Sequence, residues 1–333
     1  MKLRRAVAAF LTVMLSACGP VGDDGGERQP NEPREESQPK PPSREGLEWR
    51  RHASAPTPRT EVAAVALGGR IYVIGGFAED GSTVPTLEIY DPQQDRFSRG
   101  PDLPLAVNHA MAASHGDTLY VFGGYREGLS APTDRAFALR AGRWEEIPRM
   151  PEVRAAAGAA AIGGKVYVAG GVGAAGLATS TMVLDVASGA WSVAPGLRTP
   201  REHLGIATDG RRLYAVGGRR PQNLDAAEVL DPSTGVWSEI PNLPTARGGL
   251  AAAGTSNGFI VAVGGETAED TFDEAEAFDV DAGRWLRLPG LPTARHGLGV
   301  AALGEVVYVI AGGPRPGFAF SGANESIDLS SLR

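Results

Sequence analysis

The chain has 333 residues, a formal net charge of −7 at pH 7, 45 Gly, 25 Pro and one Cys. The acidic balance excludes a general nucleic-acid-binding protein, because phosphate binding needs a basic surface. A single Cys excludes an intramolecular disulfide, a Cys-based zinc site and a Cys-x-x-Cys redox centre. The longest apolar run, about ten residues near the N-terminus, is too short for a membrane-spanning helix.

The N-terminal residues have the layout of a secretory signal. A basic start over residues 2–5 precedes an apolar stretch over residues 6–15, and two small residues lead to Cys18. The run Leu-Ser-Ala-Cys resembles a bacterial lipobox, in which the signal is cut before Cys and the thiol is lipidated. The alternative is a buried helix with an incidental Cys. The resemblance implies a signal peptide over residues 1–17 and a lipid anchor on Cys18, and Gly19 favours the outer membrane over the inner one.

The next segment has the composition of a tether. Residues 19–46 contain six Pro and eleven charged residues with almost no large apolar side chain. Such a segment cannot bury enough surface to offset its chain entropy. We therefore expect residues 18–46 to form a lipidated, disordered spacer that holds residues 47–333 away from the membrane.

A repeat of 47–48 residues governs the rest of the chain. A β-branched or apolar strand ending in two small residues, usually Gly-Gly, occurs six times, over residues 71–76, 119–124, 166–171, 213–218, 260–265 and 307–312. An aromatic residue recurs in step at Phe97, Trp144, Trp191, Trp237 and Trp285. Small-residue segments such as Ala63–Ala66 precede the apolar strands and suit an innermost, crowded position.

These positions resemble the Kelch motif: a double Gly ending one strand, a Tyr-Asp-like pair such as Tyr90-Asp91, and a Trp six residues beyond the Asp. Four strands per repeat is the spacing of propeller blades. The prediction is an all-β fold, a six-bladed Kelch-type β-propeller over residues 47–333.

The two ends of the repeat array predict how the ring closes. In the sixth repeat the Asp-like position is Asp328, so its aromatic residue would fall one position beyond Arg333. Trp49 stands 48 residues before Phe97 with no repeat ahead of it. The N-terminal strand around residues 47–51 should therefore complete blade six beside Ile327 and remove the open edge of the ring.

An arginine recurs just before the innermost strand of five repeats. Aligned across the six repeats, the position holds Arg59, Asn108, Arg154, Arg201, Arg247 and Arg295. The Kelch resemblance implies that these residues surround the entrance of the central channel. Because a guanidinium grips a carboxylate with two hydrogen bonds, we predict a site for a protein, an acidic peptide or an anionic glycan. The alternative is that each Arg pairs with a local acid and only keeps a rim soluble.

Metal and acidic-loop sites are weaker possibilities. His109 and His296 fall at the same repeat position in this alignment, with His203 one residue further along. They could ligate a metal, but they lie on different blades, so we predict exposed or hydrogen-bonded histidines and no metal site. The loop from Glu266 to Glu276 has six acidic residues but not the glycine spacing of a calcium loop, and a solvated loop is expected.

Two functions follow, and neither needs a cofactor. The first is a lipid-anchored, non-catalytic binding module of the cell envelope. The second is an enzyme similar to the sialic-acid mutarotases among periplasmic Kelch propellers, with Glu61, His109, Glu202, His203 and His296 as acid/base candidates. Copper radical oxidases, which resemble this scaffold, are excluded because they need a Cys inside the propeller. No catalytic pair is recognisable in the sequence, so we favour binding and leave the catalytic residues unassigned.

Overall fold

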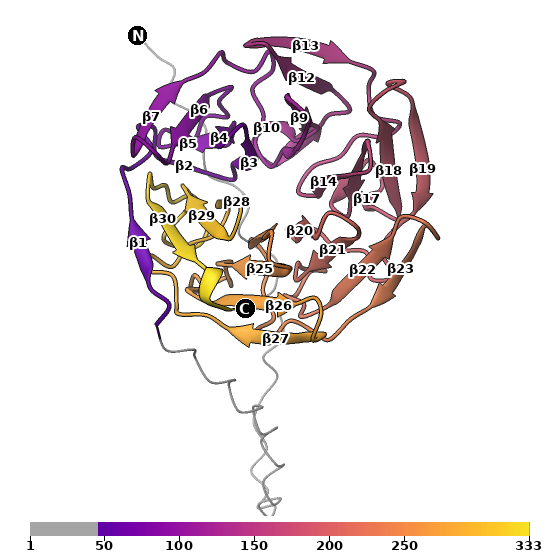
Figure 1. The fold of residues 1–333 in the computed structure, drawn as a ribbon. Helices are drawn as coiled ribbons and strands as arrows, with labels where there is room; N and C mark the ends of the chain where they lie inside the picture. The colour runs from indigo at the N-terminus through magenta and orange to yellow at the C-terminus, as the bar shows by residue number, and fades with distance from the viewer. Residues whose placement is uncertain (1–45, 333) are drawn as a thin grey trace, which may run out of the picture. The chain divides into compact units, whose positions relative to one another are not determined.

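The computed structural model describes residues 46–332 as a ring of blades around a central channel (Figure 1). In this part of the chain, six four-stranded antiparallel sheets form the blades. This confirms the predicted six-bladed propeller.

Each blade runs from an inner to an outer strand. Blade one comprises β3 (Ala63–Leu67), β4 (Arg70–Ile74), β6 (Leu87–Asp91) and β7 (Arg96–Arg99). Blade two comprises β8 (Met111–His115), β9 (Thr118–Phe122), β12 (Ala136–Arg140) and β13 (Arg143–Ile147). Blade three comprises β14 (Gly158–Ile162), β15 (Lys165–Ala169), β18 (Ser180–Asp185) and β19 (Trp191–Pro195).

The second half of the ring repeats this order. Blade four comprises β20 (Gly205–Thr208), β21 (Leu213–Val216), β22 (Ala227–Asp231) and β23 (Val236–Glu239). Blade five comprises β24 (Ala251–Gly254), β25 (Phe259–Val263), β26 (Ala275–Asp279) and β27 (Arg284–Arg287). Blade six comprises β28 (Gly299–Leu303), β29 (Val306–Ile310), β30 (Asn324–Asp328) and β1 (Trp49–Arg51).

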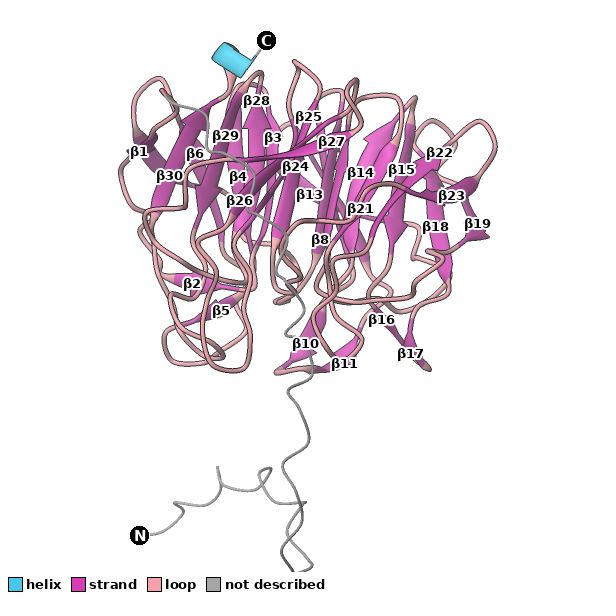
Figure 2. Ribbon diagram, turned by 90° about the horizontal axis from the view of Figure 1, so that it is seen from below, coloured by secondary structure: helices cyan, strands magenta, loops and turns pink. Residues whose placement is uncertain are grey.

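Short strands extend the loops on one face of the ring. They are β2 (Arg59–Thr60), β5 (Phe77–Ala78), β10 (Tyr125–Glu127), β11 (Ser130–Pro132), β16 (Val172–Gly173) and β17 (Gly176–Leu177). Figure 2 shows them on the face opposite η1 (Ser330–Leu332), a 3-10 turn. We call the face with the short strands the loop face.

The hydrophobic core lies between the blades. Six clusters of buried side chains each join two neighbouring blades, including the first and the last. The second strands, such as β25 with all five residues buried, are apolar on both faces because each packs against both neighbours. The inner strands contribute Ala and Gly, and these small residues leave room for the channel.

Pairing of the first strand with the last closes the ring, as predicted. Trp49 lies opposite Ile327 in the register of β1 and β30. The Trp49 indole donates a hydrogen bond of 2.8 Å to the carbonyl of Pro289, in the connection between blades five and six. Trp144, Trp191 and Trp285 donate equivalent bonds to a proline carbonyl just before their own blades. The N-terminal strand therefore holds blade six in the way that the outer strands of blades two, three and five hold theirs.

The double glycine is a steric requirement where the second strand ends. Gly75 has a φ of +64°, and a Cβ on it would lie 2.3 Å from the carbonyl oxygen of Val107. In blade six Ala311 takes this position with a φ of +61°. Only a small side chain is compatible with the close approach of the next blade.

The predicted signal peptide over residues 1–17, the lipidated Cys18 and nearly all of the tether over residues 18–46 lie outside the described residues. Between residues 46 and 332, the structure contains no helix with the length and apolar character needed to cross a bilayer.

Candidate functional site

The five arginines predicted to surround the channel entrance are instead inside the blades. Their exposed fraction is 0%, so their guanidinium groups are not available to a ligand. They are Arg59, Arg154, Arg201, Arg247 and Arg295. The predicted arginine-lined site for an anionic ligand is therefore wrong.

Arg201 shows what these side chains do. Its guanidinium donates hydrogen bonds to the carbonyls of Gly217 (2.6 Å), Thr199 (2.9 Å) and Ala215 (3.0 Å) and contacts Glu228 at 2.5 Å. Glu228 is 1% exposed and lies on the third strand of the same blade. The ion pair thus ties the segment before the inner strand to the second and third strands. Burial lowers the pKa of Arg201, and Glu228 counteracts that effect.

The same pair occurs in blades one, five and six. Arg59 contacts Glu88 at 2.9 Å, and Arg247 and Arg295 contact Glu276 and Glu325 at 2.5 Å. In blade three the third strand offers Met182 at the Glu position, and Arg154 bonds to Glu152 and Ser180 instead. Each of the five buried arginines thus has a carboxylate partner, because an unpaired buried charge would cost much free energy.

Blade two lacks both charges, and its register corrects the sequence alignment. The amide of Gly124 bonds to Arg154 O and that of Gly171 to Arg201 O, whereas the amide of Gly76 bonds to Val107 O. Val107, not Asn108, therefore occupies the arginine position. Phe137 occupies the glutamate position, and both replacements are buried.

A closed belt of backbone hydrogen bonds surrounds the channel on the loop face. In each blade, the residue two positions after the arginine position accepts a hydrogen bond through its backbone carbonyl from a backbone amide of the next blade. Taken in blade order from blade one, the donating amides are those of residues 109, 156, 203, 249, 297 and 62. The accepting residues are Glu61, His109, Ala156, His203, Gly249 and Gly297, and all six have positive φ. We call these six the belt residues. His109 and His203 are thus equivalent, whereas His296 precedes its belt residue by one.

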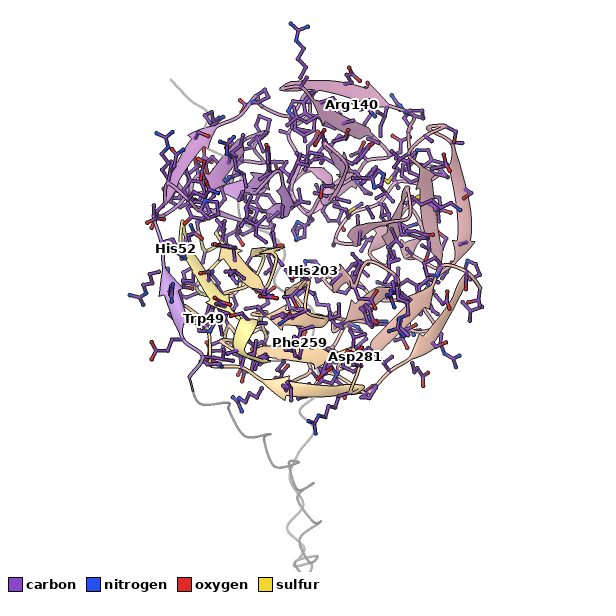
Figure 3. The ribbon with its side chains drawn as sticks, viewed as in Figure 1. Trp49, His52, Arg140, His203, Phe259 and Asp281 are labelled. Atoms are coloured by element: carbon purple, nitrogen blue, oxygen red, sulfur yellow. The ribbon has the colours of Figure 1, made fainter. Side chains whose placement is uncertain are left out.

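Three belt residues have ionisable side chains, and the other three are Ala or Gly. Glu61, His109 and His203 have polar side chains, while Ala and Gly at the other positions leave space between them. Figure 3 shows His203 beside the central opening, with Trp49 and Arg140 at the outer perimeter. The side chains of His109 and Glu61 are 3% and 12% exposed.

Glu61, His109 and His203 meet at one point. The Nε2 atom of His109 lies 3.0 Å from Nε2 of His203 and 3.1 Å from Oε2 of Glu61. The ligand atoms of all three residues lie within 4.8 Å of one another. Among the described residues, this is the group of His, Cys, Asp and Glu side chains whose spacing suits a metal ion.

A second layer of charged groups surrounds this point. Glu202 accepts a hydrogen bond from Nδ1 of His203, and its other oxygen accepts one of 2.9 Å from Arg219. Arg219 also donates to Glu266 at 3.1 Å. His296 Nε2 lies 3.5 Å from oxygens of both Glu61 and Glu266. We call these seven residues, the three at the meeting point and the four of the second layer, the mouth cluster.

Burial and charge set the protonation of the cluster. Burial lowers the pKa of His109 to about 4, although Glu61 opposes the shift. Burial acts to raise the pKa of Glu202, but the hydrogen bond from His203 and the charges of His203 and Arg219 outweigh it and bring the pKa to about 2. Burial likewise opposes the net lowering of the pKa of Glu61, which His109, His203, His296 and Arg219 cause. At neutral pH the cluster therefore contains carboxylates and a neutral His109.

An apolar rim stands over this polar floor. A pocket of about 90 Å³ is lined by Glu61, His109 and His203 together with Phe77, Leu129 and Phe318. Phe77 and Phe318 contact edge to face, with ring centroids 5.1 Å apart. Leu129 and Phe318 are 63% and 64% exposed. An exposed apolar rim around convergent polar groups is a common form of a binding site.

The structure thus unites the five acid/base candidates and adds residues that sequence reasoning missed. Arg219 and the previously assigned loop residue Glu266 directly follow the double glycines of their repeats, as do Phe77 and Tyr125. Each residue at this position pairs with the residue that precedes a belt residue, for example Arg219 with Glu202 and Glu266 with Gly248. The residue after each double glycine therefore lies at the mouth, and this position in the sequence could have been used to predict the residues that line it.

The acidic loop is not simply solvated. Glu266 is 8% exposed and bonds to Arg219 and to the amide of Gly317, and Glu276 is the buried partner of Arg247. The expectation of a solvated loop is wrong for these two residues. Each belongs to one of two charge systems, the mouth cluster or the pairs within the blades.

Blade number, strand order and the double glycines define a β-propeller built from Kelch repeats. Residues 58–104 match the family model of the Kelch motif, and residues 97–243 match that of the KLHDC2/KLHL20/DRC7 Kelch-repeats domain.

Individual relatives match over one or two repeats. The chain is 36% identical over 76 residues to Kelch repeat protein M-T8 of Myxoma virus, a match that covers 23% of this chain and 15% of the relative. It is 44% identical over 61 residues to human Kelch-like protein 6, covering 18% of this chain and 10% of the relative. Mouse Kelch-like protein 35 is 33% identical over 76 residues, 23% of this chain and 13% of the relative. The chain thus matches only a small part of these curated relatives.

Proposed function

We propose that this chain is a binding module whose ligand, a segment of another protein, docks on the loop face at the mouth of the channel. The observation that carries the proposal is the position of the exposed apolar residues. Four large hydrophobic side chains in the described part of the chain are more than half exposed: Leu129, Val193, Val236 and Phe318. Two of the four, Leu129 and Phe318, stand on one pocket together with buried ionisable groups.

The charge of the mouth favours a different ligand from the one predicted from sequence. Three carboxylates, Glu61, Glu202 and Glu266, outnumber the one guanidinium of Arg219, and that guanidinium is already paired with two of them. These partly buried pairs leave the Arg219 guanidinium without a free side for an anionic ligand. The proposed ligand is therefore a protein loop with an apolar side chain and, beside it, a basic one.

Binding should be tested with a peptide array and matched surface variants. The full chain with Cys18→Ser would be applied in three forms: otherwise unchanged, with Leu129→Ser and Phe318→Ser, and with Val193→Ser and Val236→Ser. The control valines have similar exposure, 55% and 54%, but lie on the outer strands β19 and β23. Loss of peptide binding only in the Leu129 and Phe318 variant supports the proposal. Equal binding by all three forms would contradict it.

The site of action is a second part of the proposal. The lipobox-like run ending at Cys18 supports display of the propeller from a membrane of the cell envelope, with the outer membrane favoured by Gly19. Two acyl chains or more give stable anchoring. Cell fractionation tests this: the protein should pellet with membranes, and Cys18→Ser should move it to the soluble fraction. An unchanged membrane pellet would exclude lipidation as the anchor.

A sialic-acid mutarotase-like activity is the second candidate, because all five acid/base candidates converge at one mouth. Glu61, Glu202 and His109 have pKa values below their ordinary ranges, so all three are unprotonated at neutral pH and none is a proton donor. A mutarotase needs a proton donor as well as an acceptor, so binding remains the first proposal. NMR of freshly dissolved N-acetylneuraminic acid would detect faster anomer exchange, and an unchanged exchange rate would exclude this activity.

A further inference from the structure

Three hydrogen-bond acceptors face one another at the floor of the mouth. Asn108 donates through its amide nitrogen to the carbonyl of Gly128 and to Thr83, both at 2.9 Å. A carbonyl only accepts, so this orientation places Oδ1 of Asn108 against Nδ1 of His109, at 2.6 Å. Nδ1 of His109 must therefore carry the hydrogen. In the neutral ring, Nε2 is then a bare lone pair.

His203 is oriented in the same way by a carboxylate. Glu202 is ion-paired with Arg219, so it accepts a hydrogen bond from Nδ1 of His203. In a neutral His203 ring, Nε2 is likewise an acceptor, and this atom lies 3.0 Å from Nε2 of His109. The carboxylate oxygen of Glu61 is the third acceptor, 3.1 Å from Nε2 of His109. Three such acceptor atoms repel one another unless a proton or a metal cation lies among them, and the ligand atoms of all three residues lie within 4.8 Å of one another, a spacing that suits a metal ion.

We propose that Glu61, His109 and His203 bind a divalent first-row transition metal such as Zn²⁺ at the mouth of the channel. This replaces the expectation, drawn from sequence, that the histidines form no metal site. The site goes beyond the proposed binding function, since metal binding requires no protein partner. Two imidazoles and one carboxylate are a ligand set for zinc and non-haem iron, whereas magnesium and calcium prefer oxygen ligands alone.

The surroundings have the features of a functional metal site. A metal-bound histidine usually donates its other N–H to a carboxylate or carbonyl oxygen, which fixes the ring and strengthens its basicity. His203 donates to Glu202, and His109 donates to the side-chain carbonyl of Asn108. Three protein ligands leave a coordination position for a further ligand, and the pocket lined by Phe77, Leu129 and Phe318 adjoins it.

The belt explains how residues far apart in sequence reach one ion. Glu61, His109 and His203 come from blades one, two and four, and each has a φ of 51–54°. The hydrogen-bonded backbone holds these three side chains in a preset arrangement. The belt residue between the two histidines is Ala156, and its small side chain leaves room for them to approach each other.

The test is a Zn²⁺ titration of the untagged, metal-free full chain, followed by calorimetry. Cys18→Ser should be present in every protein compared, so that no thiol contributes. We expect one Zn²⁺ per chain, a higher melting temperature with Zn²⁺ than with Mg²⁺, and a visible absorption spectrum when Co²⁺ replaces Zn²⁺. Glu202→Gln should weaken Zn²⁺ binding roughly 10–100-fold, and His109→Ala or His203→Ala should weaken it further.

His115→Ala is the matched control, because His115 ends the inner strand β8 on the far side from the belt. It should bind Zn²⁺ like the parent chain. If an alanine variant is unfolded by circular dichroism, His109→Gln and His203→Gln take its place. Equal Zn²⁺ affinity in the parent and both histidine variants would overturn the proposal. So would a folded parent chain that binds neither Zn²⁺ nor Co²⁺, in which case a proton supplies the missing positive charge.

Discussion

The segments that enter the inner strands hold two kinds of charged residue, two positions apart, with opposite physical roles. Arg201 is fully buried, and carbonyls and Glu228 accept its hydrogen bonds. Two residues later, His203 lies on the belt, and its Nε2 atom lies 3.0 Å from Nε2 of His109. Charge within the blades is matched and serves the fold. At the mouth, three carboxylates share the one guanidinium of Arg219 with nearby histidines, and such clusters of interacting ionisable groups are characteristic of positions that serve a ligand.

The largest expected effect comes from breaking one pair within a blade. Arg247→Met leaves Glu276 buried without its partner and should cost about 3–5 kcal/mol of the free energy of unfolding. Arg247 is a clean choice because its belt residue is Gly249, which has no side chain at the mouth. Urea unfolding followed by circular dichroism measures the loss. A loss below about 1 kcal/mol would mean that the pair contributes no more than a surface ion pair does.

Removing both charges should cost less than the two single changes together. Arg247→Val with Glu276→Phe copies the combination that blade two already uses at Val107 and Phe137. The double-mutant cycle should give a coupling energy of about 1–3 kcal/mol, because neither residue is then left as an unpaired buried charge. Strictly additive losses in urea unfolding would show that the two side chains do not act as a pair.

Removing a charge at the mouth should not lower the free energy of unfolding as Arg247→Met does. Glu61→Gln keeps the shape of the side chain and removes its negative charge from the cluster that it forms with His109 and His203. In the metal-free protein it should leave the free energy of unfolding within about 1 kcal/mol of the parent, or raise it, because functional sites often sacrifice stability. The measurement is urea unfolding in the presence of a chelator. A loss as large as that of Arg247→Met would place Glu61 among the structural charges.

The smallest effect concerns the backbone of the belt. Ala156 has a φ of 52°, which is strained for a residue with a Cβ. Ala156→Gly should raise the free energy of unfolding by up to about 1 kcal/mol. Ala160→Gly, on the inner strand of the same blade, is the control and should lower it by about 0.5–1 kcal/mol. Thermal unfolding of both variants separates the two effects, and a loss in both would show that belt geometry carries no strain.

The fold could be predicted from the sequence because the same strand pattern occurs in six repeats, and each repeat supports the assignment of the others. The double glycines and the Trp positions predicted the blades, and the displacement of Trp49 predicted the closure that the pairing with Ile327 confirms. The lipid anchor at Cys18 is a prediction that the described residues do not test.

The site was less predictable because burial depends on partners from other strands. An arginine before an inner strand could be exposed at the channel entrance or buried within the blade. The residues that decide between these two positions are its buried partners on the third strands, Glu88, Glu228, Glu276 and Glu325. The sequence does contain the relevant pattern: four blades have both Arg and Glu, and blade two has neither. Comparing the repeats with each other would have predicted the pairs. The one-residue shift that separates Val107 from Asn108 required the hydrogen-bond register.

The belt also has a consequence for how such a propeller can change. Its hydrogen bonds are made by the backbone alone, and its six positions already tolerate Glu, His, Ala and Gly. An exchange of side chain therefore removes none of these hydrogen bonds, although a Cβ on Gly297 would lie 2.6 Å from Oε1 of Glu61 and would have to displace that side chain. The side chains that face the mouth are thus carried by the belt, and the structural ion pairs lie in a separate layer within the blades. New ligand specificities can arise by substitution at these belt positions one blade at a time, and a designer could rewrite the site in the same way.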